Sequence, residues 1–63
     1  MTNEMKKIRF QIARIEGTRP NFVQIERTEE ISETEKKVYV KVKGCKAYAI
    51  VREDRVERIF AVV

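Results

Sequence analysis

The most regular pattern in the chain is a pair of alternating segments over residues 37–52, separated by Gly44 and Cys45. Alternation of apolar and polar residues is typical of a half-buried β-strand, and a two-residue loop that starts with glycine is typical of a type II′ hairpin turn. The sequence therefore predicts a hairpin in which Val42 lies opposite Ala47. Its apolar side consists of Val38, Val40, Val42, Ala47, Ala49 and Val51.

The other side of the predicted hairpin is basic and carries two tyrosines. In the same register the facing pairs are Lys43 with Lys46, Lys41 with Tyr48, Tyr39 with Ile50, and Lys37 with Arg52. Slipping the register by one residue would mix the apolar and polar sets, so the alternation itself supports this assignment of faces. Like charges directly opposite each other destabilise a sheet, and a bound anion would relieve that cost.

A last strand is expected after a turn at Glu53 and Asp54. This turn pairs Val51 with Val56, but strict alternation beyond Val56 would then bury Arg58. We therefore predict a β-bulge near residues 57–58. The bulge returns Ile59 and Ala61 to the apolar side and leaves Phe60 near Tyr48 on the basic side.

The amino-terminal half has weaker patterns. Ile8, Phe10 and Ile12 alternate with polar residues, which predicts a strand over residues 7–12, followed by a turn at 17–21 and a second strand over 22–26. Residues 28–35 are acidic, and the pattern fits either a helix of one or two turns or a solvated loop. Residues 1–5 are expected to be disordered.

These elements add up to five strands in one domain that spans residues 1–63. The expected fold class is all-β, or β-rich with one short helix. Five short strands fit a small barrel or a curved antiparallel sheet of the SH3-like or OB-like kind, and the pattern does not choose between them.

Composition agrees with a strand-rich fold, because the chain has eight valines, seven isoleucines and no leucine. Charged residues make up 38% of the chain, a usage that resembles hyperthermophile proteins. In size and charge the chain is similar to the small basic proteins that coat DNA in thermophilic archaea. This similarity is one of composition and involves no shared motif.

Several classes of function are disfavoured by the residues that are missing. The chain has one cysteine, Cys45, and no histidine, so we expect no disulfide framework, no metal site, no cofactor and no enzymatic activity. Paired glutamates such as Glu29 and Glu33 are interpreted as a solvated surface rather than a catalytic or metal-binding pair. No apolar run has the length of a membrane span or a secretory signal, which predicts a cytoplasmic protein that does not enter a membrane. We also expect no small-molecule substrate.

The basic side of the hairpin is the strongest candidate for a binding surface. The chain has a net charge of +4, and residues 26–36 have a net charge of −3, which leaves +7 on the rest. Exposed cations with aromatic rings between them suit phosphates and bases, so we predict nucleic-acid binding that is largely independent of sequence. The candidate contact residues are Lys7, Arg9, Lys37, Tyr39, Lys41, Lys43, Lys46, Tyr48, Arg52, Arg58 and Phe60. The choice between DNA and RNA, and between single and double strands, stays open, and a merely solubilising basic surface is the competing interpretation.

A second hypothesis is a protein-interaction or assembly module. Tyr39, Tyr48, Ile50 and Phe60 would form an apolar patch, and the last strand would offer a free edge for pairing. A homodimer is one form that such an assembly would take, because a small domain gains stability from association.

Overall fold

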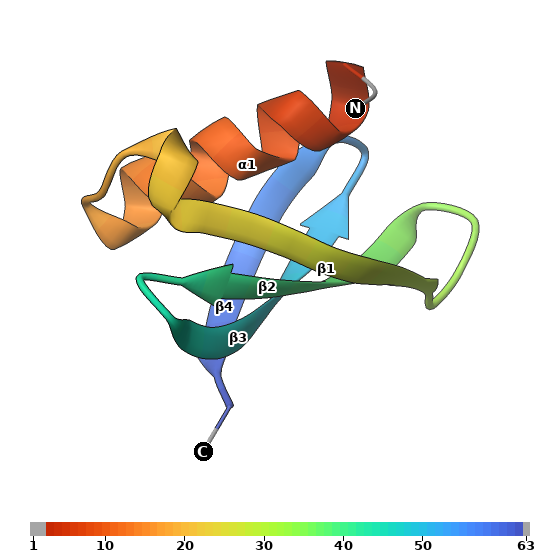
Figure 1. The fold of residues 1–63 in the computed structure, drawn as a ribbon. Coiled ribbons are helices and arrows are strands. Elements are labelled where there is room, and N and C mark those ends of the chain that lie inside the picture. Colours follow the sequence, from red (N-terminus) through yellow and green to blue (C-terminus); the bar gives the residue numbers. More distant parts are fainter. Residues whose placement is uncertain (1–2, 63) are drawn as a thin grey trace.

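The computed structural model describes residues 3–62, which contain one α-helix followed by four strands (Figure 1). In chain order the elements are α1 (Asn3–Glu16), the short 3₁₀ helix η1 (Pro20–Phe22), β1 (Val23–Glu30), β2 (Glu35–Val42), β3 (Cys45–Arg52) and β4 (Arg55–Ala61). Within these residues no helix is long and apolar enough to cross a lipid bilayer.

The four strands form one antiparallel sheet with the spatial order β1-β2-β3-β4. Each strand pairs with its neighbour in the sequence, so β1 and β4 are the edges of the sheet. Helix α1 lies against one face (Figure 1). The domain is therefore strand-rich with one helix, and the predicted count of five strands is wrong, because residues 3–62 contain four strands in a sheet that is not closed.

The missing strand is the segment over residues 7–12, which belongs to α1. Ile8 and Ile12 are fully buried, whereas Phe10, which the strand prediction placed beside them, is 48% exposed. A spacing of four residues fits one face of a strand and one face of a helix equally well. Ala13 distinguishes the two possibilities, because it is buried next to Ile12, as a helix allows and an alternating strand does not.

Helix α1 begins at Asn3 and is followed by a glycine. Residues 3–5, predicted to be disordered, form its first turn, while residues 1 and 2 lie outside the described residues. At the other end Gly17 has a φ of +68°, and the N–H of Thr18 donates to the carbonyl of Ala13 at 2.8 Å. The N–H of Gly17 donates to the carbonyl of Arg14 at 3.3 Å, which completes a Schellman motif.

The hairpin of β2 and β3 has the predicted faces but different partners. All six residues of the predicted apolar side are buried. The turn consists of Lys43 and Gly44, both with positive φ (51° and 81°), as in a type I′ turn. The predicted type II′ turn at Gly44 and Cys45 is therefore wrong, and every pair differs by two residues. Val42 faces Cys45, Val40 faces Ala47, Tyr39 faces Tyr48, and Lys37 faces Ile50.

This register also replaces a repulsive pair with an attractive one. Arg52 lies opposite Glu35 rather than opposite Lys37. Between β2 and β3 one like-charged pair remains, Lys41 with Lys46. Opposite charges across a strand pair stabilise a sheet and like charges destabilise it, which favours the observed register.

The hairpin of β3 and β4 follows the prediction closely. Glu53 and Asp54 form the turn, Val51 pairs with Val56, and the register shifts at Glu57. Beyond this bulge Ala49 pairs with Ile59, and Tyr48 pairs with Phe60. The bulge keeps Arg58 out of the core, which is the physical reason for which it was predicted.

The acidic segment forms strand ends and a loop rather than a helix. Strand β1 extends to Glu30, and residues 31–34 connect it to β2. The Ser32 hydroxyl accepts hydrogen bonds from the N–H groups of Thr34 (3.3 Å) and Glu35 (3.2 Å). Of the two alternatives left open by the sequence, the loop is the one observed, and it is short because the strands on both sides are longer than expected.

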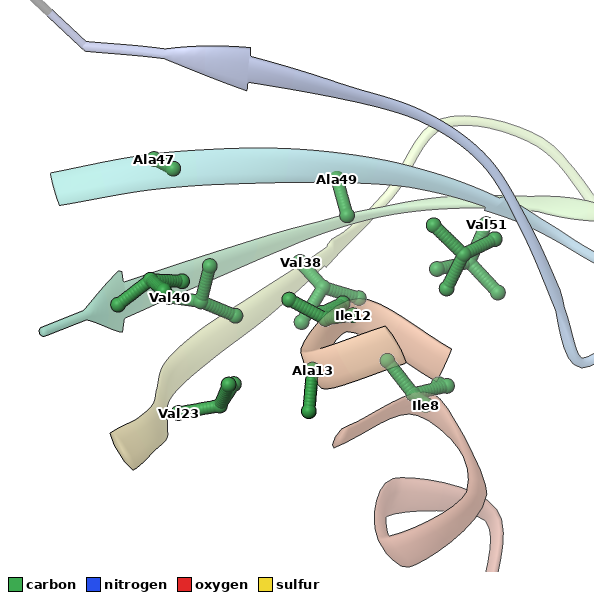
Figure 2. Packing of buried hydrophobic residues seen from close by; sticks show 11 residues of the cluster. Ile8, Ile12, Ala13, Val23, Val38, Val40, Ala47, Ala49 and Val51 are labelled. Carbon is green, nitrogen blue, oxygen red and sulfur yellow. The ribbon is translucent and has the colours of Figure 1, made fainter. Parts of the chain in front are cut away.

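The core lies between α1 and the apolar face of the sheet. Figure 2 shows Ile8, Ile12 and Ala13 of the helix close to valines and alanines of the strands. Helix α1 comes closest to the two edge strands, β1 and β4, and its buried side chains fill the space over the middle of the sheet. This contact covers one face of the sheet.

Polar contacts of Gln11 and Glu4 connect the helix to the sheet around this core. The Gln11 side chain donates from Nε2 to the carbonyl of Asp54 at 2.7 Å and accepts from the N–H of Val56 at 2.9 Å. Near the start of α1, Glu4 forms an ion pair with Lys36. The hydrogen bond with Lys36 lowers the pKa of Glu4, and the same bond raises the pKa of Lys36, so both groups stay charged at neutral pH.

Two isoleucines of α1 provide a direct test of this packing. Ile12→Ala should lower the free energy of unfolding by about 2–4 kcal/mol, because it removes a fully buried side chain and leaves a cavity. Ile15 is 57% exposed on the same helix, so Ile15→Ala should change the free energy by less than about 0.5 kcal/mol. Urea unfolding followed by circular dichroism measures both values, and equal losses would contradict the helix orientation.

Candidate nucleic-acid interface

The face of the sheet away from α1, here called the open face, is where the predicted site residues gather. Residues on a strand alternate between the two faces, so the neighbours of the buried valines and alanines belong to the open face. A bulge at Glu26 in β1 changes the phase of that strand and brings Arg27 to the open face, opposite Tyr39. The result is a row that crosses all four strands: Arg27, Tyr39, Tyr48 and Phe60.

Three aromatic rings lie in contact along this row. The ring centroids of Tyr39 and Tyr48 are 6.2 Å apart with the planes tilted by 51°. Those of Tyr48 and Phe60 are 5.1 Å apart, with nearly parallel planes at 27°. Both distances fall in the range of favourable aromatic pairs. The rings thus form a continuous aromatic ladder from β2 to β4, and Phe60 at its end is 39% exposed.

Two cations rest on the ladder. The Arg27 guanidinium lies 4.3 Å from the centroid of the Tyr39 ring. Lys37 Nζ lies 4.4 Å from the Tyr48 centroid and 5.1 Å from the Tyr39 centroid. A hydrogen bond with the Tyr39 phenol is the main reason why the pKa of Lys37 is raised, so this ammonium remains charged well above neutral pH. The positive charge is held over the rings by cation–π attraction.

Further rows of charge lie on either side of the ladder. One row consists of Glu29, Lys37, Ile50 and Arg58, and the row on the opposite side contains Gln24, Lys41 and Lys46. A further row lies at the end of the sheet that holds the turn between β3 and β4, and it consists of Glu35, Arg52 and Arg55. The cations of the open face are therefore Arg27, Lys37, Lys41, Lys46, Arg52, Arg55 and Arg58. Glu29 and Glu35, which lie opposite Lys37 and Arg52, reduce the positive potential at one end only.

Both ends of the acidic segment are paired within the sheet. Glu29 is paired across the strands with Lys37, and Glu30 with Lys36. At the other end of the face, near Lys41 and Lys46, the strand neighbours are Gln24 and apolar residues. The positive charge is consequently least compensated at the end of the sheet that holds the turn between β2 and β3.

Most of the predicted contact residues share the open face, and three do not. The residues brought together there are Lys37, Tyr39, Lys41, Lys46, Tyr48, Arg52, Arg58 and Phe60. Lys43 lies in the turn that ends this face. Lys7 and Arg9 belong to α1, which packs on the opposite face of the sheet, because their segment is helical rather than extended.

Arg27 and Arg55 belong to the open face and were not among the predicted residues. Arg27 lies beyond the point where the apolar alternation of β1 ends, and only the bulge at Glu26 directs it to this face. The available signal was charge complementarity, because Glu29 and Glu30 are followed closely by Lys36 and Lys37, as expected for a hairpin. Arg55 is a turn neighbour of Arg52 and faces it across β3 and β4.

The side chains that bear other chemistry are few and scattered in the described part of the chain. Among residues 3–62 no three cysteine, aspartate or glutamate side chains are grouped so that they could hold a metal ion. Cys45 is an exposed free thiol next to the turn between β2 and β3. The open face, with its rings and cations, is therefore the most distinctive chemical surface of the domain.

Comparison with known proteins adds no assignment: no protein family matches this chain, and no curated protein or solved structure is significantly similar to it. The function of this chain is therefore inferred from the geometry and chemistry of the open face.

The position of Lys37 over the ladder can be tested in solution. The ε-methylene protons of Lys37 should have resonances shifted upfield by the Tyr48 ring, because its ammonium lies near the ring axis. Tyr48→Leu should move these resonances most of the way to ordinary lysine values in a proton–carbon NMR spectrum. Lys46 has no ring contact in this region and serves as the reference, and an unshifted Lys37 would contradict the cation–π geometry.

Proposed function

We propose that this chain binds nucleic acid with its open face, largely without regard to sequence, and coats the strand rather than reading it. The cations contact phosphates, and Tyr39, Tyr48 and Phe60 pack against bases or sugars. The observation that carries the proposal is the row of Arg27 and three contacting rings across all four strands, with cations in the rows on both sides.

The ladder supports this proposal because its rings are paired with mobile cations. Lys37 and Arg27 cover ring surfaces in the free protein. Both side chains are long and flexible, so they can turn to a phosphate while a base takes their place on the ring. Stacking of a base on an aromatic side chain contributes roughly 1–3 kcal/mol in proteins that bind single strands. When a cation turns from its ring to a phosphate, one cation–π contact is lost, and a stacked base and an ion pair are gained.

The arrangement of charge supports binding that is insensitive to sequence. The rows of the open face contain seven cations and the carboxylates of Glu29 and Glu35, and Glu53 and Glu57 lie beside Arg52 and Arg55 at the end that already holds Glu35. Lysine and arginine on an exposed sheet follow a phosphate backbone without fixed geometry, and binding releases condensed counterions. The chain has no histidine, and the pKa of Lys37 is raised. Binding should thus respond strongly to salt and weakly to pH between 6 and 8.

The charge contribution can be measured with matched sets of substitutions. Lys41→Gln, Lys46→Gln and Arg58→Gln together should weaken binding of a labelled oligonucleotide and reduce the salt slope by roughly 2–3, about one per lost phosphate contact. Fluorescence anisotropy at several salt concentrations gives the slope for single-stranded DNA, duplex DNA and RNA.

The matched control removes the same charge from α1, with Lys6→Gln, Lys7→Gln and Arg14→Gln, all exposed on the helix. This variant should keep nearly the full salt slope, because the open face is intact. If the two triple variants lose affinity equally, binding depends on net charge alone and the open-face site is rejected.

The contribution of the rings is tested separately. Tyr48→Leu should weaken binding to a single-stranded oligonucleotide roughly tenfold or more, in line with the loss of one stacked base. Phe10, which is exposed on α1, provides the control, and Phe10→Leu should leave the affinity unchanged. Equal affinities of the Tyr48 variant and the unmodified protein would show that the ladder takes no part in binding.

The exposed end of the ladder favours a second candidate function, a protein-assembly module. Phe60 in β4, an edge strand of the sheet, and Val62 just after it are exposed, and Ile50 is half-buried on the neighbouring strand β3. An apolar interface of this kind would persist at high salt and would raise the mass measured by light scattering. A concentration-dependent dimer that Phe60→Ser dissociates, together with no oligonucleotide binding at low salt, would make this the better supported function.

A further inference from the structure

A surface cavity of about 560 Å³ lies at the end of the open face, where η1 meets the turn between β2 and β3. Its volume is within the range of small-molecule sites. It is lined by Asn21, Phe22, Gln24, Lys41, Lys43 and Gly44.

The walls of this cavity are held by backbone contacts. The N–H of Lys43 donates to the carbonyl of Phe22 at 3.0 Å, which joins the hairpin turn to η1. Pro20 begins η1, and the N–H of Phe22 donates to the carbonyl of Arg19 at 3.0 Å. At the turn Gly44 has a φ of +81°, and no atom lies within 4 Å of the place where its Cβ would be. The cavity is therefore open above the turn and fixed at its base.

The side chains in the cavity match the groups of a nucleotide. Phe22 is 50% exposed and offers an aromatic surface for stacking. Asn21 and Gln24 are both exposed in the cavity wall, so the donors and acceptors of their side-chain amides can reach a ligand. The ammonium groups of Lys41 and Lys43 supply positive charge for the phosphate next to a stacked base.

The cavity is continuous with the open face. Gln24 and Lys41 line the cavity, and they also face each other in the row that leads to Lys46. A strand that lies along the ladder therefore passes the mouth of the cavity where the positive charge is least compensated. One base of that strand can enter the cavity while the neighbouring phosphates stay in contact with the open face.

We propose that this cavity binds one unpaired base of a single strand and prefers adenine; the inference rests on the proposed function of the open face. A base in the cavity cannot be stacked in a duplex, which makes the preferred ligand single-stranded. Asparagine and glutamine pair with adenine by donating to N7 and accepting from the N6 amino group. The amides of Asn21 and Gln24 beside the Phe22 ring provide these groups.

The test compares short labelled oligonucleotides in an anisotropy titration. The first consists of thymidine only, the second has one adenosine at its centre, and the third has an abasic site there. The single adenosine should raise the affinity roughly tenfold over thymidine, as expected for one bidentate amide–adenine contact. The abasic oligonucleotide should bind no more tightly than the thymidine oligonucleotide.

Variants assign the preference to the cavity. Asn21→Ala with Gln24→Ala should remove the tenfold preference while changing the affinity for the thymidine oligonucleotide less than twofold. Phe22→Leu should also reduce the preference, which gives a second measurement if the double variant is poorly folded. Asn3→Ala, which removes an exposed amide from the start of α1, is the control and should keep the preference.

The outcomes separate the two proposals. Binding of all three oligonucleotides with equal affinity, or a preference that survives in the cavity variants, would overturn the adenine site and leave the open-face function standing. Tighter binding to duplex than to any single strand would also overturn it. Failure of every oligonucleotide to bind at low salt would reject the open-face function and the cavity proposal together.

Discussion

The burial of one apolar sheet face beneath a single helix is the constraint on which the rest of this domain depends. Ile8, Ile12 and Ala13 supply the helix side of the core, and valines and alanines from all four strands supply the other side. Burial of apolar area is the main favourable contribution to folding, and one helix can cover only one face of a sheet. The opposite face is left to solvent across its whole width.

Only some of the charged groups on the open face have favourable partners within the domain. Cross-strand pairs such as Glu35 with Arg52, and cations over the tyrosines, satisfy some of its groups. Lys41 and Lys46 remain opposite each other near the turn between β2 and β3, a placement that costs free energy in the isolated protein. A sheet that keeps such a pair beside exposed rings is well suited to an anionic partner with flat groups, and a nucleic acid has both features. The cavity at the same end adds hydrogen-bonding amides to this surface, so binding without sequence preference and selection of one base can coexist on one sheet.

The two bulges connect the core to the open face. At Glu57 the extra residue keeps Arg58 out of the core and carries Phe60 to the ladder. At Glu26 the extra residue moves Arg27 to the open face, where its guanidinium covers Tyr39. In both places one inserted residue changes which face the following side chains occupy. Burial on one face and chemistry on the other are thus set by the same local irregularities.

The sequence by itself determined which residues of β2 and β3 are buried, because a period of two is unambiguous over long alternating runs. It also predicted the bulge in β4, because a buried Arg58 is prohibitively costly. It did not determine the helix, since Ile8 and Ile12 are four residues apart and fit both periods. Tertiary structure decided that point, because the apolar sheet face needs a cover. It also decided the cross-strand partners, the position of Arg27 and the cavity beside Phe22. These depend on turn conformation, on a bulge and on contact between distant segments, which local pattern does not encode.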